Sequence, residues 1–161
     1  MALYFGLSHK HGHSSKDFDL TQWTDKPTLK NYENVMSKSL ISYEKRLNRL
    51  VDKVNDYGSK TIFVTQSSKR AYEFRDDKLF GVNKKLKYQD IYINGVDYYH
   101  MIKLLNDITI SVANKRNVMI IDLNNEIEFD IKEDFYDLSH HTASGAKKIG
   151  IYLFNKLKYL Y

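Results

Sequence analysis

Two residue types that together move protons stand three positions apart near the end of the chain. Asp137 precedes His140 in the segment Asp-Leu-Ser-His. On a turn, this spacing places the carboxylate against Nδ1 of the imidazole, which fixes the ring tautomer so that Nε2 can take a proton from a hydroxyl nucleophile. The pair therefore predicts the acid–base half of a serine-hydrolase triad.

The same spacing occurs a second time, at Asp97 and His100, so spacing alone does not identify a site. Apolar periodicity places Asp97 at the start of a helix, where an acidic residue is typical and a neighbouring histidine packs. Asp137 instead lies in the loop before the last predicted helix, which Thr142 can cap. His141 adjoins His140 and is the alternative base.

Other polar residues are weaker candidates. Three alternating histidines at 9, 11 and 13 suit zinc or nickel if the segment is extended, and suit a polar loop or a substrate-binding segment otherwise. Ser8, Ser67 and Ser68 follow predicted strands and are candidate nucleophiles. None of them has the tight strand-to-helix turn that exposes such a residue.

The composition narrows the class of protein. The chain has 161 residues, which predicts a single domain over 1–161, and the absence of cysteine excludes disulfide scaffolds, Cys-ligated zinc and thiol catalysis. The net charge is +5, but the lysines are scattered among acids, so we expect no nucleic-acid partner. The sequence shows no secretory signal and no apolar run near the roughly 18 residues of a membrane span, which predicts a cytoplasmic protein without a membrane partner.

The elements that must position these residues alternate along the chain. Apolar or β-branched runs predict strands at 2–6, 60–66 and 118–122, and apolar steps of three and four predict helices at 28–57, 97–116 and from about 142. The segment 67–95 is expected to be irregular. This order favours a parallel sheet whose ligands bind beyond the carboxyl ends of the strands, at 6–13, 66–68 and 134–142.

The last of these segments resembles the SGNH (GDSL) hydrolases. In that family an Asp-x-x-His pair followed by Thr and Gly opens the final helix, and Asp137, His140, Thr142 and Gly145 match this block. Residues 61–66 and 97–123 are also similar to the family. The resemblance implies an α/β fold with three αβα layers and a flavodoxin-like parallel sheet, present from the third strand onward, with Asp137 and His140 as catalytic residues.

The sequence also departs from the family. The Gly-Asp-Ser nucleophile block does not occur, and the first two strands have no counterpart, so we expect a domain that is incomplete at its N-terminus. The family's Gly-x-Asn-Asp block corresponds to Gly6-Leu-Ser8-His9. The resemblance thus assigns oxyanion and substrate binding to Gly6, Ser8 and His9, with Ser8 in place of the usual Asn.

These implications predict a serine ester hydrolase or acyltransferase for O-acyl, often O-acetyl, esters of a carbohydrate or lipid. The chain would be the portion that carries the His and Asp of the triad, and it would need no cofactor and no metal. The alternative is a non-catalytic binding or interaction domain of the same type. Strand 2–6 would be a sheet edge in the family order, which predicts a homodimer by edge pairing.

Overall fold

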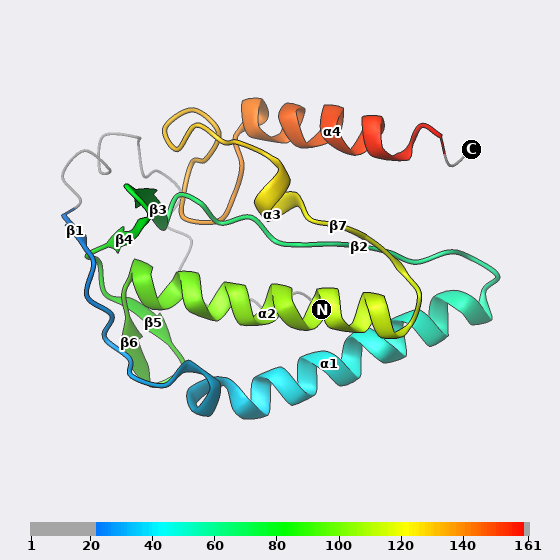
Figure 1. Cartoon of the computed structure of the whole chain (residues 1–161), viewed down its shortest axis with the longest axis horizontal. Helices are drawn as coiled ribbons and strands as arrows, with labels where there is room; N and C mark the ends of the chain where they lie inside the picture. The colour runs from blue at the N-terminus through cyan, green and yellow to red at the C-terminus, as the bar shows by residue number, and fades with distance from the viewer. Residues whose placement is uncertain (1–21, 160–161) are drawn as a thin grey trace. The chain divides into compact units, whose positions relative to one another are not determined.

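The computed structural model describes residues 22–159, which divide into two compact units. Within that range the first unit comprises 22–30, 68–99 and 127–159, and the second comprises 31–67 and 100–126. Both contain helices and strands (Figure 1), so the chain is an α/β protein as predicted. No helix among the described residues is long and apolar enough to cross a membrane.

The second unit contains a parallel pair of strands with two long helices. Its elements are α1 (Tyr32–Asp56), β2 (Ile62–Val64), most of α2 (Gly95–Lys115), β7 (Met119–Ile121) and α3 (Leu123–Glu126). β2 and β7 run parallel, with Phe63 opposite Ile120. The predictions of strands at 60–66 and 118–122 and of helices at 28–57 and 97–116 are confirmed, with shorter strands than expected.

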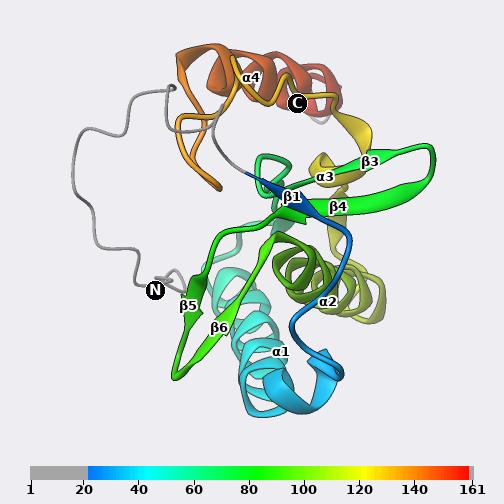
Figure 2. The same cartoon turned by 90° about the vertical axis from the view of Figure 1, so that its left-hand side faces the viewer.

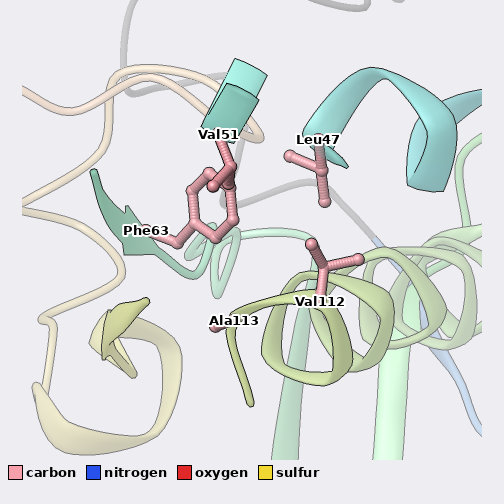
Figure 3. Close-up of a cluster of buried hydrophobic side chains, with 5 residues drawn as sticks. All are labelled: Leu47, Val51, Phe63, Val112 and Ala113. Atoms are coloured by element: carbon pink, nitrogen blue, oxygen red, sulfur yellow. The ribbon is translucent and has the colours of Figure 1, made fainter. Parts of the chain in front are cut away.

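The core of the second unit lies where both helices meet β2. Five side chains converge there (Figure 3): Leu47 and Val51 from α1, Phe63 from β2, and Val112 and Ala113 from α2. Leu47 and Val51 are spaced by four, so they share one face of α1. Burying aliphatic and aromatic side chains at about 25 cal/mol per Å² is the main force that holds these elements together.

The ends of α1 have identifiable causes. The Asn31 side chain accepts a hydrogen bond from the backbone N–H of Asn34, so the helix begins at Tyr32, four residues later than its apolar periodicity predicts. Gly58, which follows the C-cap, has φ of +70°, a conformation that glycine adopts at little cost.

The first unit is built from antiparallel hairpins and one helix. Its small sheet has the order β1-β4-β3 (Figure 2), formed by β1 (Trp23–Thr24), β4 (Lys78–Val82) and β3 (Tyr72–Arg75). A second hairpin pairs β5 (Leu86–Tyr88) with β6 (Ile91–Ile93), and α4 (Ala143–Leu157) closes the chain. α4 begins where the sequence predicts a helix from 142.

The prediction that 67–95 is irregular is wrong. Asp76 and Asp77 both have positive φ and join β3 to β4 in a two-residue turn. Gln89 also has positive φ and lies with Asp90 in the turn between β5 and β6. Among the described residues β2–β7 is the parallel pair, and the other ladders are antiparallel. The predicted strand 2–6 lies outside the described residues.

Candidate active site

Asp137 and His140 form the pair that their spacing predicts. Oδ2 of Asp137 lies 2.7 Å from Nδ1 of His140. Oδ1 of the same carboxylate accepts hydrogen bonds from the backbone N–H groups of Ser139, at 2.9 Å, and His140, at 2.8 Å. One oxygen thus closes an Asx turn, and the other is hydrogen-bonded to the imidazole. Asp137 contacts Nδ1 of the ring and not Nε2.

The hydrogen bonds around Asp137 keep it ionised. Partial burial alone would raise the pKa of this carboxyl, but the N–H groups of Ser139 and His140 and the His140 ring outweigh burial and lower the pKa below its ordinary value of 3.8. Asp137 is therefore a carboxylate at neutral pH, which is the form that can orient an imidazole and stabilise its protonated state.

A buried cation supports the same turn from within the first unit. The Arg70 side chain, in a residue only 2% exposed, donates to the carbonyl oxygen of Phe135 and interacts electrostatically with Asp137. Burial lowers the pKa of Arg70 and the charge of Asp137 raises it again, but an arginine stays protonated throughout the physiological range. Arg70 therefore fixes the backbone before the turn and supplies positive charge to the carboxylate.

A buried phenol lies beside this turn as well. Burial and the negative charge of Asp137 raise the pKa of Tyr98 to about 12, against the opposing effect of a side-chain hydrogen bond with Ser139. The Tyr98 hydroxyl accordingly keeps its proton at neutral pH. It serves as a hydrogen-bonding support of the loop and not as a base.

The imidazole of His140 lies at the surface. Its side chain is 48% exposed, and the ring stacks on that of Tyr136 with centroids 5.6 Å apart and an interplanar angle of 13°. Tyr136 is itself 53% exposed. The histidine is thus open to solvent, and the stacked ring restricts how the imidazole rotates.

The fully buried Asp134 ties the loop to α4. Its carboxylate accepts hydrogen bonds from the backbone of Asp130, the Ser144 hydroxyl and Lys148 Nζ, and its backbone carbonyl accepts from Thr142. Two of these bonds are to the first turns of the helix, so they attach the loop to the start of α4.

The helix start itself agrees with the sequence. Thr142 is the N-cap of α4, and its hydroxyl accepts from the backbone N–H of Gly145. Glycine is required at 145 because a Cβ there would lie 2.3 Å from the carbonyl oxygen of Asp134.

His141, the alternative base, occupies a different environment. Its ring lies between those of Phe129 and Phe135, with centroid distances of 4.9 and 4.4 Å, and its Nδ1 is buried without a hydrogen-bond partner. Burial lowers the pKa of His141, and the neighbouring Asp134 only partly offsets the effect. His141 is thus a neutral packing residue, and the carboxylate-paired histidine is His140.

The second Asp-x-x-His copy is structural, as its position at a helix start predicts. The buried carboxylate of Asp97 accepts hydrogen bonds from the backbone N–H groups of Thr28, Leu29 and Asn94. The ring of His100 packs against another aromatic ring, Tyr32, at a centroid distance of 4.7 Å.

The remaining sequence candidates are either outside the described residues or buried. Gly6, Ser8, His9 and the alternating histidines lie outside the described residues. Ser67 and Ser68 are buried, and neither hydroxyl has a hydrogen-bond partner in the described structure. No group of three or more His, Asp or Glu side chains between residues 22 and 159 is placed to hold a metal ion.

Sequence reasoning missed Arg70, Tyr98 and Tyr136. Arg70 belongs to a Lys-Arg pair that has the appearance of surface charge, and Tyr98 belongs to the apolar stripe of a helix. Tyr136 adjoins Asp137, so proximity in sequence was the available signal. No protein-family model, curated protein or solved structure matches this chain, so the chemistry of the site rests on its geometry.

Proposed function

We propose that this chain carries the acid–base half of an SGNH-type serine ester hydrolase or acyltransferase. Its substrates would be O-acyl esters, in particular O-acetyl esters, of a carbohydrate or lipid. The observation that supports this proposal is the 2.7 Å bond between Asp137 and Nδ1 of His140 in an exposed turn directly before the last helix.

In the proposed mechanism, Nε2 of His140 takes the proton of a serine hydroxyl as the serine oxygen attacks the ester carbonyl carbon. His140 then returns this proton to the departing alcohol, and an acyl-serine remains. Water or a second alcohol attacks the acyl group, again with His140 as the base, and the serine is released. Asp137 stabilises the imidazolium that forms in each step, and general-base catalysis of this kind contributes about 10²–10⁴-fold.

The nucleophile and the oxyanion donors would come from outside residues 22–159. Ser67 and Ser68 are buried and do not present an exposed hydroxyl. Gly6, Ser8 and His9 remain the proposed oxyanion and substrate-binding residues. In the same proposal β2 and β7 are strands of a flavodoxin-like parallel sheet, and strand 2–6 is the next strand of that sheet. The helices α1 and α2 belong to the helical layers of the three-layer fold.

The test uses the complete enzyme, including the polypeptide that supplies the serine. It measures hydrolysis of a chromogenic acetyl ester together with labelling by a fluorophosphonate, which reacts with activated serines. His140→Ala should lower kcat by about 10²–10⁴-fold with little change in melting temperature, and added imidazole should restore part of the rate. His100→Ala is the matched control, because it removes the histidine of the other Asp-x-x-His copy. Equal turnover by wild type and His140→Ala would contradict the assignment.

The burial of Ser67 and Ser68 also favours the second candidate, a non-catalytic SGNH-like binding domain. In that case the complete protein would neither turn over the ester nor react with the fluorophosphonate. A homodimer formed by edge-strand pairing is compatible with either function. Sedimentation equilibrium that shows a monomer at micromolar concentration would rule out this dimer.

A further inference from the structure

α4 and the residue that follows its C-cap carry charge of one sign. The segment 143–159 contains four lysines and no acidic residue. Lys148, near the start of the helix, binds the buried carboxylate of Asp134. The other three, at 147, 156 and 158, extend along the helix to its C-cap.

Two large apolar side chains of α4 are exposed. Ile151 is 54% exposed and Phe154 is 66% exposed. Lys147, Ile151, Phe154 and Lys158 follow one another at steps of four, three and four, so they share one face of the helix. On this face, which we call the Phe154 face, the apolar pair stands between two lysines.

The hydrogen bonds between α4 and the loop before it lie in the first turns of the helix. Ser144 and Lys148 contact Asp134, and Gly145 is the buried residue of the helix. Beyond this attachment the Phe154 face remains accessible. The C-terminal end of the face continues into Tyr159, an exposed ring with Lys158 Nζ 4.9 Å from its centroid.

The size and charge of the Phe154 face indicate which kind of partner can bind it. A stable protein interface buries about 800 Å² on each partner, which two apolar side chains and two lysines do not provide. Binding to an anionic bilayer needs a smaller buried area, because a few inserted apolar groups add to the attraction between lysines and lipid phosphates. Tyrosine and lysine side chains are also favourable at the membrane interface.

We propose that the Phe154 face binds the surface of an anionic phospholipid bilayer. Ile151 and Phe154 insert among the headgroups, and Lys147 and Lys158 contact the lipid phosphates. The expectation of no membrane partner rests on the absence of a long apolar run, which an interfacial helix does not require. This proposal is independent of the esterase chemistry.

The test is co-sedimentation of the full chain with vesicles. We expect binding to phosphatidylcholine vesicles that contain phosphatidylserine, little binding to phosphatidylcholine alone, and weaker binding as salt is added. The double variant Ile151→Ser/Phe154→Ser should lower the affinity for these vesicles by at least about tenfold. Lys147→Gln and Lys158→Gln should each weaken binding by about fivefold.

The matched control is Ile41→Ser/Leu50→Ser, which removes two exposed apolar side chains from α1. This control should bind like wild type, and circular dichroism should show that all variants stay folded. Equal binding to neutral and anionic vesicles, or unchanged binding by the Ile151/Phe154 variant, would overturn the proposal. So would a self-association that this variant abolishes in the absence of vesicle binding, because the occupant would then be a second copy of the chain.

Discussion

Because Gly145 lies against Asp134 and Gly150 does not, alanine substitutions at these two glycines of α4 should change the stability of the protein in opposite directions. A Cβ at 145 would lie 2.3 Å from the carbonyl oxygen of Asp134 and 3.1 Å from its carbonyl carbon, whereas a Cβ at 150 would have no atom within 4 Å. Alanine is a better helix former than glycine by about 0.8–1.0 kcal/mol. Gly150→Ala should therefore stabilise the protein, and Gly145→Ala should destabilise it.

The size of the destabilisation follows from what must move. An ordinary contact needs about 1 Å more between position 145 and the backbone of Asp134. Overpacking of this kind costs about 1–3 kcal/mol, and the same movement stretches the bonds from Ser144 and Lys148 to the buried carboxylate, each worth about 1.5–3 kcal/mol. With about a third of the two bond energies lost, roughly 1–2 kcal/mol together, and the propensity gain subtracted, we expect a net loss of about 1–4 kcal/mol.

Thermal unfolding followed by circular dichroism measures both effects. At about 2–4 °C per kcal/mol for a chain of this length, Gly145→Ala should melt about 2–16 °C below wild type and Gly150→Ala about 2–4 °C above it. If both alanines stabilised the protein equally, α4 would not approach Asp134 as described. The account of how the loop and helix are joined would then fail.

Three further predictions concern other parts of the structure. The pKa of His141 is lowered in the folded state, so the contribution of this residue to stability is complete above the ordinary value of 6.5 and is lost as the pH falls below it. Between pH 7.5 and 5.5 the melting temperature of His141→Phe should therefore fall by less than that of wild type. Phe63→Ala should lower the free energy of unfolding by about 3–5 kcal/mol in a denaturant titration, against less than about 0.5 kcal/mol for the exposed Ile41→Ala. Asp97→Asn should cost about 1–3 kcal/mol in the same titration, because the buried carboxylate accepts three backbone N–H groups, and a loss no larger than that of the exposed Asp107→Asn would contradict this role.

The features that were predictable from sequence are those fixed by neighbours along the chain. The turn at Asp137 is closed by bonds to residues two and three positions away, and the start of α4 by a cap three residues long. The helix at 28–57 was predicted for the same reason. Its start was placed too early because Leu29 follows the apolar period, although its N–H is bound by Asp97, far along the chain.

The features that were missed depend on distant partners or on very short elements. β3 and β4 are four and five residues long, too short for a clear alternation, and their turn is Asp76-Asp77 and not the usual Asn-Gly. Arg70 is buried, and its hydrogen-bond partner, the carbonyl of Phe135, is 65 residues away in the sequence. A basic residue with such a partner cannot be told from a surface residue in one sequence.

The two oxygens of Asp137 have a consequence for how this pair assembles and persists. Because the bonds to Ser139 and His140 span at most three residues, the Asp–His pair can form on the timescale of local loop closure, before any long-range contact exists. The geometry of the pair is thus set within four consecutive residues. Substitutions in distant elements should therefore change the surroundings of the imidazole more than its bond to Asp137.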